Sequence, residues 1–539
     1  MNGLMMGQPL LISSLLKHAE RHHRNVEVVS AQPGGIHRET LGELAERARR
    51  MANAIAALGT KDGDRVATMA WNSHRHMELY YAASGSGRVL HTVNPRLHPD
   101  QIAYVINHAE DQILFFDADL LSVVDAVAAK LTSVRHYVVM TDRAHMPASA
   151  VIKDLLCYED LLAAQSDSYQ WPILDENAAA SLCYTSGTTG NPKGVLYSHR
   201  SSLLHTFAVG LPDGLNIGGN EVVLPIVPMF HVNAWGWPYL ACMVGTKMVL
   251  PGAALDGKSL YNLIEAEGVT LAGGVPTVWQ NLLSYLEAGG LSFSTLKRTV
   301  VGGAACPAPM IRKLQDTYGV QVTHAWGMTE TSPLGVSCTF KPAHALLSKE
   351  ERLAIQTKQG RAVFGVDFKI VDESGTELPW DGKATGELYV QGPWVAAQYF
   401  RQEDSPLVDG WFPTGDLCSV DSDGYVQITD RNKDVIKSGG EWISSIDVES
   451  IALGHPDVSM AACVAAPHPK WGERPLLVVV KKPGSATTRE SVLDFFQGKV
   501  AKWWIPDDVV FVDAIPLGAT GKMQKNKLRE QLTGYQLPD

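Results

Sequence analysis

The sequence has no excess of basic residues and no long apolar run. It carries 46 lysine and arginine residues against 57 aspartate and glutamate residues, which gives a formal net charge of −11, and no local basic patch reverses this balance. An acidic surface repels phosphate backbones, so we expect no nucleic-acid partner. No stretch approaches the roughly eighteen uninterrupted apolar residues that a bilayer requires, so we expect no transmembrane segment either.

Cysteine is scarce and shows no pairing pattern. Seven cysteines occur, an odd number, and no two of them form a C-x-x-C pair. Such thiols are typical of a reducing cytoplasm. The apolar stretch at residues 9–16 has no basic residue before it and no small-residue cleavage site after it, so it predicts the start of an amphipathic helix and not a secretory signal. We therefore predict a cytoplasmic protein, and the sequence leaves its oligomeric state open, with a homodimer among the alternatives.

Composition and periodicity are those of a layered globular protein. With 45% hydrophobic and 19% charged residues, the chain has an ordinary globular composition, and its 539 residues exceed what one core usually organises. The periodicity predicts helices at residues 41–58 and 260–267 and strands at Arg65–Met69, Ile113–Phe116, 136–140 and 270–273. This alternation predicts an α/β fold of layered sheets in the larger part of the chain.

The character of the sequence changes near residue 430. Residues 416–424 are interpreted as a turn-rich connection between strands, and residues 430–434 as a charged bridge. Beyond the bridge, predicted strands at 461–465 and 476–480 and an amphipathic helix at 488–503 suffice for a small α+β core. We therefore predict a large N-terminal domain of residues 1–430 and a small separate C-terminal domain of residues 434–539.

The segment 184–194 is rich in groups that bind phosphate. Its glycines let backbone N–H groups converge on an anion, its hydroxyls donate further hydrogen bonds, and Lys193 adds a positive charge. The segment departs from the common G-x-x-x-x-G-K-[ST] loop, because Asn191 and Pro192 separate Gly190 from Lys193. The density of these groups favours a phosphate loop of another kind over a solvated turn.

This segment resembles the signature of the acyl-adenylate-forming superfamily, which includes acyl-CoA synthetases, peptide-synthetase adenylation domains and beetle luciferases. Further motifs follow in that superfamily's order at residues 324–330, 411–416, 430–434 and 520–522. The resemblance implies that Trp326 stacks on adenine, that Asp416 accepts hydrogen bonds from the ribose hydroxyls, and that Arg431 contacts phosphate.

The resemblance assigns roles to individual residues. The implied ATP- and AMP-binding residues are Thr185, Ser186, Gly187, Thr188, Thr189, Gly190, Lys193, Gly303, Ala304, His324, Ala325, Trp326, Gly327, Met328, Thr329, Asp416, Ile428 and Arg431. The implied metal ligands are Glu330 and Thr185, the implied hinge pivot is Lys433, and the implied catalytic residues are Lys522, Lys193, Glu330 and His231.

Residues 228–237 resemble the acid-pocket motif of fatty-acid CoA ligases. Adenylation domains for amino acids usually place an aspartate where this sequence has His231, which argues against an α-amino acid substrate. Trp235 falls where long-chain ligases carry a gating tryptophan, and Trp237 and Met328 offer further polarizable surface. The implied acid pocket comprises His231, Val232, Trp235, Gly302, Gly303, Trp326 and Pro333.

Residues 430–445 are most similar to a bacterial subgroup that handles medium-chain fatty acids and 3-methylmercaptopropionate. The implied CoA-binding residues, which would line a pantetheine channel after the C-terminal domain rotates, are Lys437, Ser438, Gly439, Gly440 and Trp442. The resemblance thus implies an AMP-forming acyl-CoA ligase that uses ATP, Mg²⁺, CoA and a short- to medium-chain carboxylic acid. Two alternatives stay open: an adenylating enzyme that loads a carrier protein, and a nucleotide-binding sensor without turnover.

Overall fold

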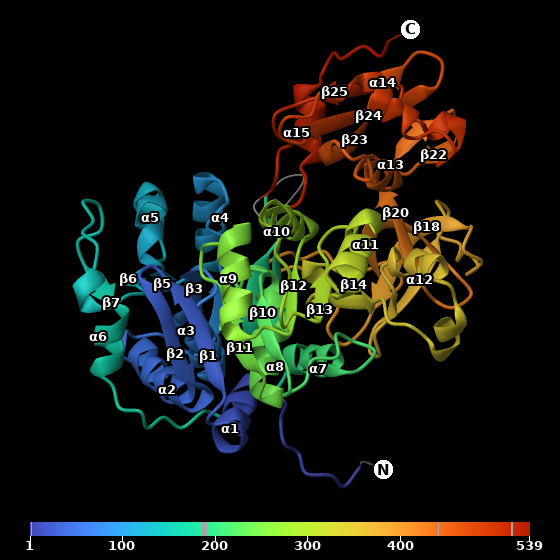
Figure 1. The fold of residues 1–539 in the computed structure, drawn as a ribbon. Helices are drawn as coiled ribbons and strands as arrows, with labels where there is room; N and C mark the ends of the chain where they lie inside the picture. The colour runs from blue at the N-terminus through green and yellow to red at the C-terminus, as the bar shows by residue number, and fades with distance from the viewer. Residues whose placement is uncertain (2, 186–190, 440, 519–520, 539) are drawn as a thin grey trace.

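The computed structural model describes residues 1–539 apart from residue 2, residues 186–190, residue 440, residues 519–520 and residue 539. Within the described part, the strands form two large sheets and two small ones. Figure 1 shows the large sheets in one body and the C-terminal residues in a separate domain above it. The predicted α/β class with a separate C-terminal domain is confirmed.

The first large sheet has seven strands within the described residues, and only its edge strand β9 runs antiparallel to its neighbour. In spatial order the strands are β7 (Leu155–Cys157), β6 (His136–Val139), β5 (Ile113–Phe116), β3 (Arg65–Met69), β4 (Val89–Thr92), β8 (Ala179–Tyr184) and β9 (Gly194–Ser198). The strands predicted at 65–69 and 113–116 are confirmed to the residue, and β6 is one residue shorter than expected.

The second large sheet has nine strands in the described part, and its central strands are parallel. In spatial order they are β16 (Arg361–Ala362), β15 (Leu334–Ser337), β14 (Gln321–Gly327), β13 (Arg298–Val301), β12 (Leu271–Gly274), β10 (Val222–Pro225), β11 (Lys247–Leu250), β1 (Glu27–Gln32) and β2 (Gly35–Thr40). The antiparallel strands β2, β15 and β16 lie at its edges.

Helices form layers between and outside the two large sheets. The central layer contains α1 (Ile12–His22), α2 (Leu41–Ala57), α3 (His74–Gly85), α7 (His199–Gly210) and α8 (Trp237–Val244). The outer face of the seven-stranded sheet is covered by α4 (Pro99–Ala109) and α5 (Leu121–Ala128), and that of the nine-stranded sheet by α9 (Gly257–Glu267), α10 (Pro276–Gly289) and α11 (Ala308–Arg312). The shorter α6 (Tyr158–Ala163) and α12 (Lys349–Gln356) complete this body.

Local sequence explains these layers. In β5, Phe115 points into the central core whereas Leu114 and Phe116 point into the outer core, as the two-residue repeat of a strand requires. The strand is apolar throughout because both of its faces are covered. Helix α2 begins where predicted because Thr40 and Glu43 form a reciprocal capping box at its first turn.

A four-stranded antiparallel sheet leads toward the C-terminal domain. It consists of β17 (Asp367–Val371), β18 (Thr385–Gln391), β19 (Phe412–Val420) and β20 (Val426–Arg431). The interpretation of residues 416–424 as a turn-rich connection is wrong for its first half. Asp416 lies inside β19, where it pairs with Arg431 across the sheet, and the turn begins only at Asp421.

The C-terminal domain packs helices against its own sheet. The strands are β21 (Ile436–Ser438), β22 (Glu441–Ile443), β23 (Val458–His468), β24 (Gly472–Lys481) and β25 (Asp508–Phe511), and the helices are α13 (Ser445–Ala452), α14 (Arg489–Asp494) and α15 (Lys525–Gln531). The predicted helix at 488–503 is wrong in length: α14 starts after its cap Thr488 but ends at Asp494, and a turn with Gly498 at a φ of +73° follows.

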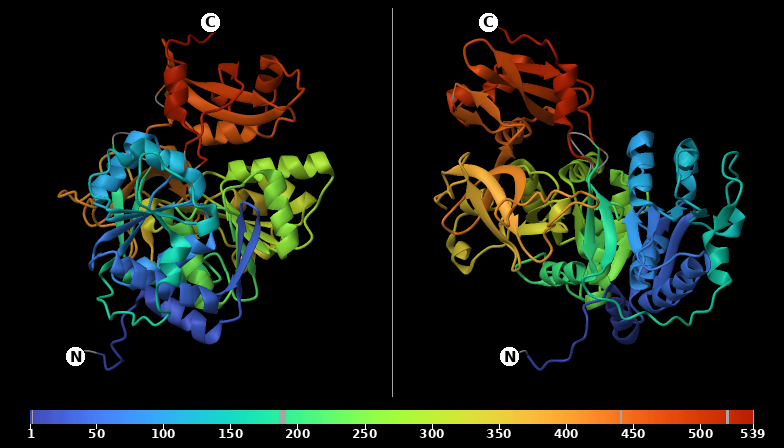
Figure 2. Two further views of the ribbon diagram at one scale, coloured as in Figure 1. Left: turned by 90° about the vertical axis from the view of Figure 1, so that its left-hand side faces the viewer. Right: turned by 180° about the vertical axis from the view of Figure 1, so that it is seen from behind.

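The N-terminus and the C-terminal domain lie at opposite ends of the molecule, as both views in Figure 2 show. Among the helices that the structure describes, none combines the length and apolarity needed to cross a membrane.

Candidate active site

A cavity of about 380 Å³ lies where the C-terminal domain meets the large body. Every predicted nucleotide, acid-pocket and catalytic residue within the described part lines it. These residues are Thr185, Lys193, His231, Val232, Trp235, Gly302, Gly303, Ala304, His324, Ala325, Trp326, Gly327, Met328, Thr329, Glu330, Pro333, Asp416, Ile428, Arg431 and Lys522. The predicted residues Ser186, Gly187, Thr188, Thr189 and Gly190 lie outside the described residues.

The cavity lies at the carboxyl edge of the nine-stranded sheet. Gly302 follows the last residue of β13, Val275 follows β12, and Trp326 is near the end of β14. Parallel strands place their carboxyl ends along one edge, and open α/β sheets bind ligands there. Segments that are distant in the sequence therefore meet around a single cavity.

Trp326 is positioned by a hydrogen bond from its indole N–H, and its ring packs against Gly335. Its indole N–H donates to Asp416 Oδ2 at 2.8 Å, and Asp416 Oδ1 lies 3.4 Å from Arg431 Nε. A Cβ on Gly335 would come within 2.6 Å of the indole ring, so only glycine fits at this position. Gly335 was missed by sequence reasoning, because a glycine required by a distant ring leaves no local pattern.

Glu330 is a buried carboxylate with a phenol beside it. The Tyr399 hydroxyl donates to Glu330 Oε1 at 2.7 Å, and the Glu330 carbonyl accepts from the Ala396 N–H at 2.7 Å. Burial raises the pKa of Glu330, and the hydrogen bond from Tyr399 opposes this rise. The Tyr399 ring centroid also lies 4.7 Å from Lys193 Nζ, so this tyrosine contacts both the predicted phosphate loop and Glu330. Sequence reasoning missed Tyr399, which belongs to none of the quoted motifs.

Lys522 enters the cavity from the C-terminal domain. The backbone carbonyl of Gly521 accepts a hydrogen bond from Thr277 Oγ1 at 3.2 Å, which ties this loop to the start of α10. Gly303 lies beside the lysine and has a φ of +80°, a conformation that favours glycine. Desolvation and the positive charge of Arg431 lower the pKa of Lys522 to about 8. The ammonium is therefore charged at neutral pH.

His231 is a neutral group in this cavity. Desolvation, together with the charge of Lys522, lowers the pKa of His231 to about 3. The imidazole can therefore donate or accept a hydrogen bond with a ligand at neutral pH, but it adds no positive charge. The prediction of a catalytic role for His231 remains untested, and its charge state limits that role to polar contact.

The backbone after His231 has an uncommon conformation. Residues 232–236 all have positive φ, from +39° at Val232 to +79° at Gly236. Left-handed backbone costs non-glycine residues roughly 1–2 kcal/mol each, so the surrounding structure must hold the turn. Asn233 provides one anchor, because its amide donates to Ser181 Oγ at 2.8 Å in the neighbouring sheet.

This turn separates the two tryptophans of the motif. Trp235 lines the cavity and lies over Gly302, where a Cβ would come within 3.3 Å of the indole. Trp237 is fully buried against Gly273 and does not line the cavity. The expectation that Trp237 offers surface to the acid is therefore wrong, because the left-handed turn directs it into the central core.

The predicted CoA-binding and hinge residues lie away from the cavity lining. Lys437 is on β21 and Trp442 on β22, with the lysine Nζ 5.8 Å from the indole ring. Ser438 is buried and accepts a hydrogen bond from Arg474 at 3.2 Å, and Gly439 packs beside a tryptophan. Lys433 lies in the turn between β20 and β21, and Gly440 lies outside the described residues. Their predicted roles need a second domain orientation and stay predictions.

A second segment, 252–259, matches the common phosphate-loop pattern G-x-x-x-x-G-K-S, but a carboxylate caps the helix that follows. Its Asp256 caps helix α9, accepting hydrogen bonds from the Ser259 N–H at 3.0 Å and the Ser259 hydroxyl at 2.6 Å. A carboxylate thus occupies the place of a phosphate at this helix start. No residue of the segment lines the cavity.

Comparisons with known proteins agree with this arrangement. A family model described as AMP-binding enzyme matches residues 15–400, and a model of the AMP-binding enzyme C-terminal domain matches residues 447–522. A 3-methylmercaptopropionyl-CoA ligase from Ruegeria lacuscaerulensis is 53% identical over 533 residues, covering 98% of this chain and 99% of the relative. A medium-chain-fatty-acid CoA ligase from Ectopseudomonas oleovorans is 52% identical, covering 98% and 97%.

Solved structures show the same fold. ATP-bound MatB from Rhodopseudomonas palustris matches with a TM-score of 0.81 at 27% identity, covering 98% of this chain and 99% of that chain. The anthranilate CoA ligase AuaEII matches with a TM-score of 0.88, covering 98% of both chains. At 24% identity this match supports only a shared fold. With both of its domains matched, the chain belongs to the family of AMP-binding enzymes.

Proposed function

We propose that this chain is an AMP-forming acyl-CoA ligase. The reaction converts a carboxylic acid, ATP and CoA into acyl-CoA, AMP and pyrophosphate through an acyl-adenylate. One observation carries the proposal: Lys522 of the C-terminal domain meets Glu330 and Asp416 in a cavity that continues to Trp235. AMP formation that requires both acid and CoA is the direct test, and adenylate formation without free-CoA consumption would point to a carrier protein instead.

The first half-reaction brings a carboxylate against the α-phosphorus of ATP. Both reactants are negative, so catalysis depends on positioning and on opposing charge. The cationic side chains that line the cavity are those of Lys522, Lys193 and Arg431. We propose that they bind the substrate carboxylate and the phosphates. His231, held neutral by burial, would contact the acid through a hydrogen bond.

The donor set at Glu330 suits Mg²⁺. Mg²⁺ in nucleotide sites is usually held by one or two carboxylates together with substrate phosphates. Glu330 offers one carboxylate, oriented by Tyr399, and the Thr185 hydroxyl lines the same cavity. When bound, Mg²⁺ would neutralise phosphate charge. The ribose would be held by Asp416, whose Oδ2 already accepts from Trp326.

The second half-reaction requires CoA to reach the adenylate. We propose domains at 1–430 and 434–539, with residues 431–433 as the hinge and Lys433 as the pivot. Rotation about it would withdraw Lys522 and bring Lys437, Gly440 and Trp442 toward the adenylate. We also propose a cytoplasmic location, in keeping with seven buried free cysteines, and the homodimer stays an untested prediction.

We propose a short- to medium-chain acid as the substrate. The names of the relatives at 52–53% identity support this choice, since they specify 3-methylmercaptopropionate and medium-chain fatty acids. Within this chain, Trp235 and Met328 line the cavity with polarizable surface that suits either a thioether or an alkyl chain. AMP formation across acids from acetate through 3-methylmercaptopropionate to dodecanoate would decide between the two.

Shortening Trp235 should move the chain-length optimum upward. In Trp235→Ala we expect kcat/KM to rise for acids longer than the wild-type optimum. For the optimal acid it should fall about tenfold, the loss expected when about two methylene contacts, each worth about 0.8 kcal/mol, are removed. The acid panel measures the shift. Trp380→Ala, an exposed tryptophan outside the cavity, is the matched control. An unchanged profile in Trp235→Ala would contradict the assignment of this side chain to the acid pocket.

Lys522 should set the alkaline limb of the pH profile. Because its pKa is lowered to about 8, the free enzyme loses this charge above that pH. We expect kcat/KM for ATP to be flat near neutral pH and to fall toward about tenfold per pH unit above about pH 8. In Lys522→Arg the limb should disappear, whatever the residual rate, because arginine stays charged. If the alkaline limb persists in Lys522→Arg, it arises from the titration of another group.

A further inference from the structure

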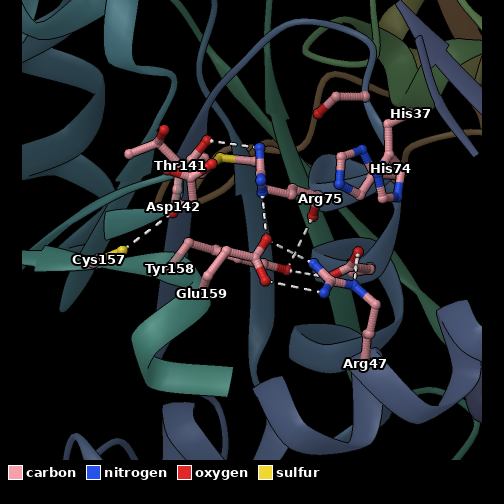
Figure 3. A network of polar contacts seen from close by, with 12 residues as sticks. His37, Arg47, His74, Arg75, Thr141, Asp142, Cys157, Tyr158 and Glu159 are labelled. Atoms are coloured by element: carbon pink, nitrogen blue, oxygen red, sulfur yellow. Dashed lines mark hydrogen bonds and ion pairs between the residues drawn. The ribbon is translucent and has the colours of Figure 1, made fainter. Parts of the chain in front are cut away.

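A cluster of two histidines and a glutamate lies outside the cavity. His37 and Glu39 are two residues apart on β2 and so share one face of the strand, and His74 is the first residue of α3. One ring nitrogen of each histidine and one carboxylate oxygen of Glu39 lie within 4.8 Å of one another. The two rings stack with centroids 3.8 Å apart, as Figure 3 shows. None of the three residues lines the cavity.

The neighbouring cations are engaged with other carboxylates. Arg47 donates to Glu78 at 2.7 Å and forms a two-pronged pair with Glu159 at 2.9 and 3.0 Å (Figure 3). Arg75 donates to Glu159 at 2.8 Å. Arg47 approaches Glu39 only to 3.6 Å, beyond hydrogen-bond distance. Two arginines thus face three carboxylates, and Glu39 is the one that accepts no hydrogen bond from them, its ion pair with Arg47 being 3.6 Å long.

Two buried polar atoms of the cluster lack partners. Glu39 is 5% exposed and His74 is 0% exposed. Within the part of the chain that the structure describes, Glu39 Oε1 and His74 Nε2 have no hydrogen-bond partner. Glu39 Oε2 lies 3.4 Å from His37 Nε2. An unpaired buried polar atom costs roughly 1–3 kcal/mol, so both atoms need a partner from outside the chain.

The second nitrogen of His74 is already occupied. Its Nδ1 lies 3.1 Å from the side-chain amide of Gln32, and its backbone N–H donates to Ser30 Oγ at 2.8 Å. The amide oxygen and nitrogen of a glutamine are interchangeable by rotation, so the Gln32 oxygen can accept a hydrogen bond from the Nδ1–H of His74. That tautomer directs the lone pair of Nε2 toward a ligand, and such an outer partner is usual for a metal-bound histidine.

We propose that His37, Glu39 and His74 bind a divalent transition-metal ion, with Zn²⁺ as the representative. Two imidazoles and a carboxylate form a known zinc ligand set that leaves a fourth position for water. Zinc ligands lie about 2.0–2.2 Å from the ion. An imidazole binds a metal in the plane of its ring, so the His37 ring must turn out of its stack with His74 as the three groups draw together. His37 is half-exposed and can move, which also opens a path for the ion. The ion ties the β1–β2 hairpin to α3.

The experiment is a Zn²⁺ titration of the purified full chain after chelator treatment, in excess Mg²⁺ to occupy the proposed Glu330 site. We expect one strongly bound Zn²⁺ per wild-type chain, and affinity about tenfold or more lower in both His37→Gln and Glu39→Gln. His22→Gln is the matched control, because His22 and His18 form a separate histidine pair on α1, and it should bind like wild type.

Thermal unfolding gives a second readout that does not depend on ligase activity. Zn²⁺ that binds only the native chain should raise the Tm of wild type and of His22→Gln but not of His37→Gln. Unfolding in chelator shows whether each variant is folded, and if Glu39→Gln fails to fold, His37→Gln decides alone. Absence of a stoichiometric site, an unchanged affinity in His37→Gln, or a loss confined to His22→Gln would overturn the proposal.

Discussion

Replacing Lys522 with alanine should lower the rate of acid-dependent ATP–pyrophosphate exchange by about 100- to 1000-fold, the usual loss when one preorganised donor to developing charge is removed. The lysine lines the cavity together with Glu330, Asp416 and Arg431, and desolvation already lowers its pKa to about 8. Its charge is therefore poorly hydrated before substrates bind, and anionic substrates satisfy it. The exchange assay isolates the first half-reaction, because it needs no CoA.

Lys527→Ala is the matched control for this variant. Lys527 lies five residues further along the chain, is exposed, and does not line the cavity. It should retain wild-type exchange, which separates the loss of one catalytic charge from a general loss of positive charge in the C-terminal domain. Unimpaired exchange in Lys522→Ala would contradict both the role of Lys522 and the domain orientation that brings it to the cavity.

Replacing Lys433 with proline should separate the two half-reactions. The hinge turn is held by the Asp434 and Val435 N–H groups, which donate to the Arg431 carbonyl at 2.8 and 3.0 Å, and by Asn432 N–H, which donates to Gly415. Lys433 is exposed, and its N–H is not among these donors. Proline at residue 433 therefore removes none of these hydrogen bonds, and we expect ATP–pyrophosphate exchange to stay near the wild-type rate.

Thioester formation should fall in the same variant. If rotation changes φ at residue 433, a fixed proline φ strains the rotated state by about 1–3 kcal/mol, which corresponds to roughly 5- to 150-fold in rate. Single-turnover transfer of a preformed adenylate to CoA measures this step. Lys433→Ala removes the side chain but keeps the backbone free, so it should transfer normally. Equal losses in exchange and transfer for Lys433→Pro would rule out a pivot at this residue.

The sequence predicted which residues line the site better than it predicted the contacts among them. The motifs predicted twenty of the described residues that line one cavity, because groups suited to bind phosphate, ribose and metal are restricted in chemistry and in local spacing. Strands such as Ile113–Phe116 were predictable for a related reason, since a short apolar run between turns has few alternatives once both sheet faces are covered.

Other features depend on partners that are distant in the chain. Tyr399 bonds to Glu330 from 69 residues away, and Gly335 is required by the face of Trp326. The left-handed turn after His231 decides that Trp235 faces the cavity and Trp237 the core, although the two residues share one motif. Local spacing carries no information on these contacts, so sequence reasoning missed the first two and misplaced Trp237.

By itself, the sequence determined the family and the α/β class and predicted the chemistry of the site, because each follows from residue types within short motifs and from the order of those motifs. Only the tertiary structure decided which side chains meet. It brought Lys522 into the cavity, separated Trp235 from Trp237, and placed His37 and Glu39 beside His74. The physical reason is that desolvation, charge pairing and packing act between side chains that contact one another in space. These side chains often come from residues that are distant in the sequence.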